Sequence, residues 1–236
     1  MISDISMIES LMGEISDALD SEVDVYMIGG GAMMYLDSKP GTKDIDLIVR
    51  SEDDFHAMIS AMKSIGFISI RPGEEYKRMN LSGMYERSDG FRVDIFDTRV
   101  CSKLSLSDHM AARAKQVGPD RNARLHVCSP MDILIFKSIT EREGDETDCL
   151  ALMSEHIIDW DEVLSEIRYQ ISEGEDVWIT WIADRMYYFS EKFGSDIPIL
   201  DDLLGMADRF LDQWEREMEA KAGELGGKDL SKLPPE

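Results

Sequence analysis

The sequence predicts an α+β protein in which a mixed-sheet domain precedes a domain made only of helices. Over residues 1–128, short apolar runs with strand character alternate with amphipathic helical segments, and several stretches resemble hairpins. After Ser129-Pro130, every segment places its apolar residues at helical spacing. We therefore expect a catalytic mixed-sheet domain over 1–128, a helical domain over 129–221 and a flexible tail over 222–236.

The first domain is expected to open with a helix and then to alternate strands with helices. Apolar residues at helical spacing predict an amphipathic helix over 2–19, and a short buried strand follows at 23–28. Three glycines end this strand, and helical spacing resumes over 32–36. The same criteria give further strands at 45–49, 67–70, 75–81, 83–87, 91–96 and 125–128, and helices at 52–65 and 108–116.

The second domain is expected to be held together by apolar stripes on its helices. Helical spacing predicts helices over 131–140, 148–155, 160–171, 177–193 and 199–219. Stripes of this kind usually form core, and the two longest are Trp178, Ile182, Met186, Phe189 and Phe193, and Leu200, Leu203, Leu204, Ala207, Leu211, Trp214 and Met218.

The charge of the chain is strongly acidic and unevenly distributed. The formal net charge is −23, which repels a polyanion such as bulk nucleic acid on average. Residues 63–124 nevertheless hold twelve basic and eight acidic residues, a net charge of +4. A phosphate-rich ligand is therefore expected at this middle segment, although a solvated surface with fewer acids explains the same composition.

Nothing in the sequence indicates export or membrane insertion, so we expect a cytoplasmic protein. The first twenty residues contain five acidic side chains, which is unlike a signal peptide, and no apolar run reaches membrane-spanning length. Cys101, Cys128 and Cys149 lack metal-ligand spacing and are odd in number, which favours reduced thiols.

Two carboxylates on one predicted strand are the strongest candidates for chemistry. Asp44 and Asp46 lie two residues apart at the start of the strand at 45–49, so their side chains point to the same face. Asp94 lies in a similar apolar setting between Val93 and Ile95. A buried carboxylate is costly unless a cation or a hydrogen-bond network accepts it, and carboxylates are the ligands that magnesium prefers.

These residues suit magnesium-dependent nucleotidyl transfer. Asp44 and Asp46 would bind the Mg²⁺ ion that carries a nucleoside triphosphate, and Asp94 would share a second ion near the attacking hydroxyl. The turn at Gly29, Gly30 and Gly31 would bring backbone N–H groups close to phosphate oxygens. The predicted reaction is in-line attack on the α-phosphorus.

Gly29-Gly30, followed by Asp44-x-Asp46 and a later Asp94, resembles the nucleotidyltransferase superfamily built on the DNA polymerase β-like palm. Within it, the chain is most similar to the AbiEii-like branch, which includes toxins of toxin-antitoxin pairs. The residues that carry this similarity are Gly29-Gly30-x-Ala32, Thr42-x-Asp44-x-Asp46, Lys137 and Arg142-x-x-Asp145-x-x-Asp148.

The resemblance implies a palm-like domain followed by helices, and an enzyme that moves a nucleoside monophosphate from a triphosphate such as ATP. It also implies nucleotide-binding roles for Thr42 and Lys137, a role for Asp145 and Asp148 in orienting the helical domain, and an antitoxin as a possible partner. Many superfamily members have Gly-Ser where this chain has Gly29-Gly30, so a serine ligand to phosphate is missing.

Several alternatives stay open at this stage. Asp97 could replace Asp94 as the third carboxylate, and Lys137 could be an ordinary helix-surface lysine. A dinucleotide-binding fold would use the same glycines, but Met34 stands where a third small residue is expected. The alternative that is not an enzyme is a catalytically silent protein with the palm fold, which binds a partner chain or RNA. The acceptor (tRNA, protein or small molecule), the base of the triphosphate and the oligomeric state cannot be read from the sequence.

Overall fold

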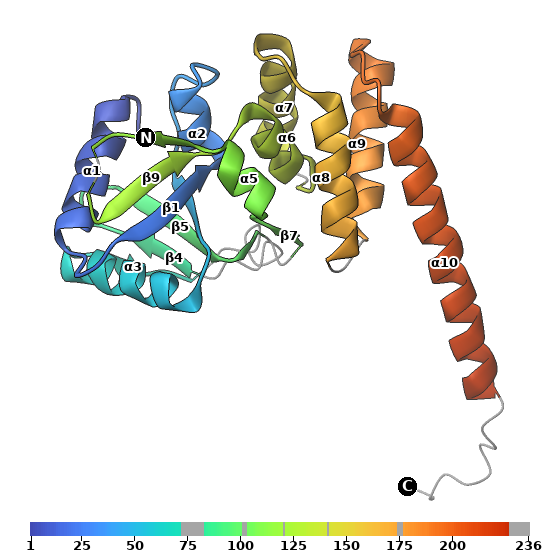
Figure 1. Ribbon diagram of the computed structural model, residues 1–236, viewed down its shortest axis with the longest axis horizontal. Helices are drawn as coiled ribbons and strands as arrows, with labels where there is room; N and C mark the ends of the chain where they lie inside the picture. The colour runs from blue at the N-terminus through green and yellow to red at the C-terminus, as the bar shows by residue number, and fades with distance from the viewer. Residues whose placement is uncertain (72–82, 101–102, 120, 141, 174–176, 227–236) are drawn as a thin grey trace, which may run out of the picture. The chain divides into compact units, whose positions relative to one another are not determined.

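The chain forms two compact units. The computed structural model describes residues 1–71, 83–100, 103–119, 121–140, 142–173 and 177–226 (Figure 1). Contacts group the chain into Met1–Glu175 and Asp176–Glu236. The predicted strand at 75–81, Cys101 and tail residues 227–236 lie outside the described residues. The division into a catalytic domain over 1–128 and a helical domain over 129–221 stays a prediction.

A seven-stranded mixed sheet forms the centre of the first unit, in the order β3-β4-β5-β2-β1-β9-β8 (Figure 1). β1 runs parallel to β9 and β2 runs parallel to β5, whereas the other neighbours are antiparallel. A separate pair, β6 (Arg99–Val100) and β7 (Leu104–Ser105), is antiparallel. The strands of the main sheet are β1 (Val23–Ile28), β2 (Ile45–Val49), β3 (Ile68–Ser69), β4 (Gly83–Glu86), β5 (Arg92–Asp97), β8 (Lys115–Val117) and β9 (Ala123–Val127). The predicted mixed sheet is confirmed.

Serine and aspartate side chains begin most helices of this unit. Their oxygens accept a hydrogen bond from a backbone N–H of the first turn, which stabilises a helix end by about 1 kcal/mol. The capping residues are Asp4, Ser51, Ser107, Ser129 and Asp159. The helices are α1 (Ile5–Asp17), α2 (Gly29–Tyr35), α3 (Glu52–Ser64), α5 (Asp108–Arg113), α6 (Pro130–Ser138), α7 (Glu143–Glu155) and α8 (Trp160–Ser172).

The two faces of the sheet differ in character. On one face, Val25, Met27, Leu47, Val93 and Ile95 are fully buried, and α1 and α3 pack against the strands. Burial of each such side chain contributes about 1.5–3 kcal/mol. Because side chains alternate along a strand, the intervening residues of β2 and β5 point to the opposite face. That second face carries the candidate carboxylates.

The connection from β1 to β2 excludes the dinucleotide-binding alternative. β1 and β2 are antiparallel neighbours, with Ile28 opposite Asp46. A dinucleotide-binding fold needs two parallel strands joined by a crossover helix. The helix between them starts at Gly29 rather than at residue 32, so the glycines form its first turn.

One predicted helix is too long. The helix expected over 108–116 ends at Arg113, and Lys115–Val117 instead pairs with β9 as an edge strand. A backbone that pairs with a neighbouring strand gains hydrogen bonds that a single sequence does not reveal. Tertiary context therefore overrides the local helical pattern here.

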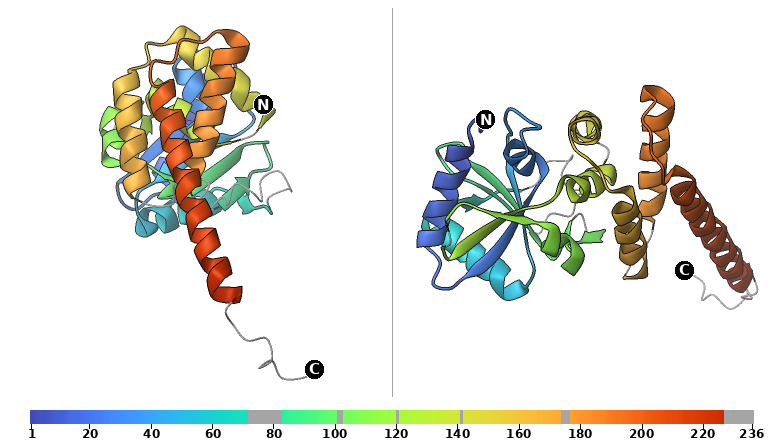
Figure 2. Two further views of the ribbon diagram at one scale, coloured as in Figure 1. Left: turned by 90° about the vertical axis from the view of Figure 1, so that its right-hand side faces the viewer. Right: turned by 45° about the horizontal axis from the view of Figure 1, so that its top comes forward.

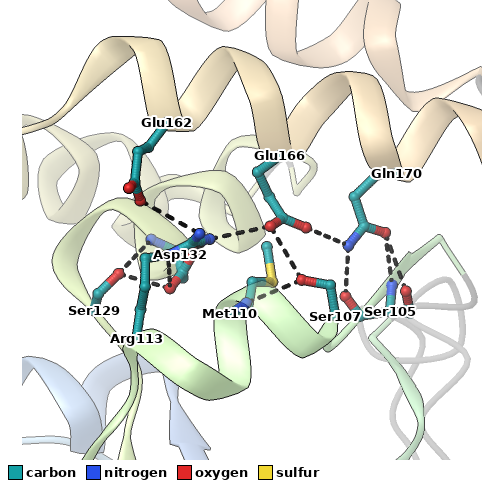
Figure 3. A network of polar contacts seen from close by, with 9 residues as sticks. All are labelled: Ser105, Ser107, Met110, Arg113, Ser129, Asp132, Glu162, Glu166 and Gln170. Carbon is teal, nitrogen blue, oxygen red and sulfur yellow. Dashed lines mark hydrogen bonds and ion pairs between the residues drawn. The ribbon is translucent and has the colours of Figure 1, made fainter.

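A buried polar network joins α5, α6 and α8 (Figure 3). The Arg113 guanidinium lies 2.6 Å from Asp132 and 3.1 Å from Glu166, and both carboxylates are almost completely buried. Gln170 donates to Glu166 at 2.9 Å and also to the backbone carbonyl of Ser105 at 2.8 Å. Loss of one partner from such a network leaves a buried group unsatisfied, so the network fixes how α8 packs on α5 and α6.

The second unit contains two helices, α9 (Trp178–Phe193) and α10 (Leu200–Gly226). Gly194 ends α9 in the left-handed conformation, with φ of 65°. α10 continues five residues into the segment predicted as tail. No helix in the described part of the chain has the length and apolar character needed to cross a membrane.

The predicted core stripes of the second unit are only partly correct. On α9, Phe193 is 45% exposed, whereas the other four members of its stripe are buried. On α10, Leu203 and Ala207 are buried, but Leu211, Trp214 and Met218 are 45–51% exposed. The prediction that these last three form core is wrong, because α10 is much longer than the helix beside it.

Candidate active site

Strand register brings two of the predicted carboxylates together. Asp46 on β2 is the direct neighbour of Asp94 on the parallel strand β5. Asp44 lies just before β2, 3.7 Å from Nη2 of Arg92, and its charge acts on Asp46. Asp97, the alternative third carboxylate, is paired in register with Val49. The face that holds Asp46 therefore also holds Asp94.

The glycine turn lies directly against the strand that carries Asp46. A Cβ atom built on Gly29 would lie 2.0 Å from Oδ2 of Asp46, and one built on Gly30 would lie 2.4 Å from Oγ1 of Thr42. Neither position can hold a side chain without displacement of a neighbour. Gly29 also has φ of 64°, which favours glycine. The predicted proximity of the glycine turn to the aspartate strand is present in the structure.

Asp46 is a buried carboxylate in an acidic setting. It is 5% exposed, and among the residues that the structure describes, none donates a hydrogen bond to its carboxylate. Burial, followed by the charges of Asp44 and Asp94, raises the pKa of Asp46 to about 8. The positive charges of Arg142 and Lys137 act in the opposite direction. This environment favours either a proton or a bound cation.

Arg92 holds Asp94. Its Nη2 lies 2.7 Å from Oδ2 of Asp94 and its Nε lies 3.0 Å from Oδ1, which is a bidentate ion pair. The same Nη2 is 3.7 Å from Asp44. Burial raises the pKa of Asp94, and the Arg92 guanidinium opposes this rise. Arg92 therefore supplies the positive charge next to the carboxylates.

The carboxylates of Asp44 and Asp46 fit a magnesium ion, whereas that of Asp94 is paired with Arg92. Asp46 offers a buried carboxylate to which no described residue donates a hydrogen bond, and the side chain of Asp44 beside it is 14% exposed. Asp94, in contrast, is engaged by Arg92. Across the described ranges, no three acidic, histidine or cysteine side chains are gathered closely enough to hold a metal ion. Asp44 and Asp46 thus fit as ligands as they stand, and Asp94 fits only after it separates from Arg92.

Lys137 lies in a buried ion-pair network. Its Nζ is 2.9 Å from Asp145 and 2.7 Å from Asp148, and Lys39 also binds Asp148 at 2.7 Å. Burial lowers the pKa of Lys137, but the two carboxylates outweigh burial and raise it. Lys137 is therefore a charged lysine, 5% exposed, and the alternative of an ordinary surface lysine is wrong.

Arg142 extends the same network. Its Nε lies 3.0 Å from Asp145, and the hydroxyl of Thr140 also donates to that carboxylate. Burial favours the protonated form of Asp145, yet Lys137 and Arg142 lower its pKa to about 2. The basic residues that the family resemblance singled out thus meet the predicted acids within one cluster.

Sequence analysis missed Arg92 and Lys39. Arg92 precedes Asp94 by two residues, so the alternation of a strand already places both side chains on one face. That signal was available. Lys39 and Asp148 are 109 residues apart, and no local pattern relates them. Only the packing of α7 near the loop before β2 brings them together.

Many basic residues of segment 63–124 are engaged within the protein. Arg87 pairs with Glu14, Arg113 pairs with Asp132, and Arg124 pairs with Asp24. The positive net charge of the segment therefore does not translate into an equally positive surface. This arrangement weakens the expectation that a phosphate-rich ligand binds along the whole segment.

No protein-family model and no curated protein matches the chain. The solved structures that match the chain include two nucleotidyltransferase structures. The aminoglycoside nucleotidyltransferase ANT(2'')-Ia, in complex with adenylyl-2''-tobramycin, is 11% identical with a TM-score of 0.46, over 70% of this chain and 98% of that chain. A proposed nucleotidyltransferase from H. pylori is 13% identical with a TM-score of 0.37, over 91% and 98%. Both TM-scores lie below 0.5, so neither similarity by itself assigns an activity to this chain.

Proposed function

We propose that this chain is a nucleotidyltransferase that moves a nucleoside monophosphate from a nucleoside triphosphate to an acceptor hydroxyl. The observation that supports it best is the placement of Asp46 and Asp94 side by side on two adjacent strands beside a glycine turn, with Asp44 just before the first of these strands. Asp46 has no donor among the described residues and is surrounded by negative charge, which is the electrostatic setting of a cation site.

Asp44 and Asp46 are the proposed ligands of Mg²⁺. A bound Mg²⁺ ion neutralises phosphate charge and stabilises the pyrophosphate that leaves. Asp46 is held rigidly by the pairing of β2 with both β1 and β5, so its carboxylate has a fixed direction. Asp94 would accept the proton of the attacking hydroxyl, or share a second ion there, once Arg92 has moved away from it.

The glycine turn is the proposed contact for the phosphates. Ile28 precedes the first turn of α2 and has no side chain that can cap it, so the N–H groups of Gly30 and Gly31 have no partner from the capping position. Thr42 lies against Gly30 and would line the same site. Backbone N–H groups bind phosphate oxygens without the entropy cost of ordering a long side chain.

Lys137 and Arg142 are proposed to add positive charge near the phosphates. Both act electrostatically on Asp46, so their positive charges would also attract an anion bound near it. Asp145 and Asp148 hold Lys137 in place at 2.9 and 2.7 Å. We propose that these acids position Lys137, and that the helices α6 and α7 thereby contribute to the nucleotide site.

The proposed family is the nucleotidyltransferase superfamily with a polymerase β-like palm, and the proposed branch is the AbiEii-like one. From that branch we propose that the chain is a toxin that acts against its host and is controlled by an antitoxin. ATP is one candidate donor of the nucleoside monophosphate. The acceptor is a tRNA, a protein or a small molecule. The acidic chain and the internally paired arginines favour an acceptor less charged than bulk nucleic acid.

A second candidate is a silent palm-fold protein that binds a partner chain or RNA. The Arg92–Asp94 ion pair supports this second candidate. The guanidinium takes the place of a metal cation at the third carboxylate but supplies no catalytic chemistry. The two functions differ in one property. An enzyme binds a triphosphate in a magnesium-dependent way, whereas a silent relative with a permanently capped site binds none.

The test is label transfer from nucleoside triphosphates. The purified chain is incubated with each α-labelled triphosphate, MgCl₂ and a cell extract, and labelled macromolecules and small molecules are separated. We expect label to move from one triphosphate to one acceptor class, and to be lost in D46N. The matched control is D53N, which changes an exposed aspartate of α3 and should transfer label like the unmodified chain. Label transfer that persists in D46N would refute the site, and absence of both transfer and triphosphate binding would favour the silent protein.

A further inference from the structure

The middle of α10 exposes an apolar stripe that no described residue of the second unit covers completely. α9 has 16 residues and α10 has 27, so α10 continues for several turns beyond its neighbour (Figures 1 and 2). Leu211, Trp214 and Met218 lie in the middle of α10 and are 45%, 51% and 46% exposed. We refer to these three residues as the α10 seam. Large apolar side chains gathered on one exposed helix face mark an interaction site more often than isolated ones do.

The α10 seam follows a coiled-coil spacing. Steps of three and four residues repeat along Leu204, Ala207, Leu211, Trp214 and Met218, which is the a and d pattern of a heptad. This period differs from the 3.6 residues of a straight surface helix and keeps the apolar line facing one partner helix. The seam is therefore suited to a second helix that lies along it.

Most of the residues that flank the seam are acidic. In the heptad frame, Asp208, Glu215 and Glu217 occupy e and g positions next to the exposed part and are exposed, and Phe210 occupies the remaining g position. The basic residues Arg209 and Arg216 occupy f positions on the far side of the helix. Charges at e and g select the partner of a coiled coil.

This pattern disfavours a second copy of the chain. Two such helices that ran antiparallel would bring e positions against e positions and g positions against g positions, which places Glu215 and Glu217 of the two copies near like charges. The net charge of −23 adds repulsion between whole chains. A helix with lysine or arginine at its own flanking positions would find complementary charge.

We propose that the α10 seam binds a basic amphipathic helix of a partner protein. Leu211, Trp214 and Met218 would be buried against apolar residues of that helix, and Glu215 and Glu217 would face its basic residues. Trp214 is the central anchor, because a half-exposed tryptophan buries a large area and such residues contribute most to binding. The inference does not depend on the activity of the site in the first unit.

The probes are two synthetic helical peptides, each about three heptads long, with leucine at a and d. One carries lysine at e and g, and the other carries glutamate there. Fluorescence anisotropy of each labelled peptide is measured against the full chain. We expect the lysine peptide to bind at least about tenfold more tightly than the glutamate peptide, which corresponds to about 1.4 kcal/mol.

Two charge variants separate the seam from the overall charge. E215K/E217K reverses the flanking positions, and D212K/E219K makes the same change of net charge at b positions, which lie farther from the seam. We expect E215K/E217K to lose its affinity for the lysine peptide and to gain affinity for the glutamate peptide. D212K/E219K should keep its preference for lysine with an affinity change of less than about threefold. Circular dichroism confirms that both variants remain helical.

A third variant tests the apolar contact. W214S should weaken the lysine peptide by at least about tenfold, since truncation of a central aromatic anchor typically costs more than 1 kcal/mol. Equal weakening by both charge variants would show that net charge alone attracts the peptide and would overturn the proposal. Self-association of the unmodified chain through the seam, detected by light scattering and abolished by W214S, would also overturn it.

Discussion

Arg92 and Asp94 form a bidentate ion pair within the candidate active site, with a closest approach of 2.7 Å. The side chain of Asp94 is almost completely buried, whereas about one-fifth of the Arg92 side chain is exposed. The pair therefore joins a fixed acid to a base that can reach solvent. This difference suggests that Arg92 moves and Asp94 stays when the site changes its occupant.

Replacement of Arg92 should uncover this relationship. R92Q leaves Asp94 buried without its partner, and loss of one member of a buried pair costs about 3–5 kcal/mol. We expect a lower melting temperature without metal, and recovery of a large part of it in millimolar Mg²⁺, because a cation replaces the guanidinium.

Thermal unfolding with and without Mg²⁺ measures the effect. R121Q is the control, because Arg121 and Asp17 form an exposed pair at 3.5 Å that should contribute less than about 1 kcal/mol. An R92Q protein that is destabilised and stays equally destabilised in Mg²⁺ would argue that Asp94 never meets a cation.

Asp46 makes the stability of the metal-free protein depend on pH. The pKa of Asp46 is raised to about 8 in the folded state, above its ordinary value near 4. The folded state then holds a proton that the unfolded state has lost, so stability falls as pH rises from about 4 to about 8. D46N removes the carboxyl group, and with it this loss of stability as pH rises.

We therefore expect metal-free D46N to be more stable than the unmodified chain at pH 8 and to differ little from it near pH 4. Denaturant unfolding at the two pH values gives the comparison. Equal stability of the two proteins at pH 8 would show that the Asp46 carboxylate is solvated or paired in solution.

Asp145 contributes stability of the opposite pH dependence. Its pKa is lowered to about 2, so its charged form stabilises the fold above its ordinary pKa, and this stability is lost as pH falls through 2. D145N should cost about 3–5 kcal/mol at pH 7, because Lys137 keeps only one of its two carboxylates. The cost should shrink below pH 3, as measured by urea unfolding. A constant cost across this range would contradict the ion-pair origin.

Gly30 tests the close approach of the turn to β2. G30A places a methyl group 2.4 Å from Oγ1 of Thr42, so the turn or Thr42 must shift. We expect triphosphate binding to weaken at least about tenfold, since a small misplacement of positioning groups has effects of this size or larger. G205A is the control, because Gly205 lies within α10 and its nearest neighbour is a flexible arginine at 3.5 Å. That variant should gain about 0.5–1 kcal/mol of stability and bind normally.

The sequence predicted the strands of the site well because their signals are local. Ile45–Val49 and Val23–Ile28 are short apolar runs bounded by polar or glycine residues, and both occur as predicted. The partnership of Asp46 with Asp94 required the register of two strands about fifty residues apart, which periodicity does not supply. The family resemblance, rather than any local pattern, indicated Lys137, Asp145 and Asp148 together.

The failures also have physical causes. The segment at 115–117 has helical spacing, but the edge of β9 offered it hydrogen bonds. Leu211, Trp214 and Met218 have the spacing of core residues, and a coiled-coil seam has almost the same spacing as a core stripe. Only the length and path of the neighbouring helix decide between them, and these are not set by α10 itself.

The most direct test of the central claim is the binding of Mn²⁺ with a nonhydrolysable triphosphate, followed by electron paramagnetic resonance. Mn²⁺ takes the oxygen ligands that Mg²⁺ prefers. The unmodified chain and D97N should bind the ion together with the triphosphate, and D44N and D46N should lose at least about tenfold in affinity. An ion that binds D46N as tightly as the unmodified chain would contradict the account.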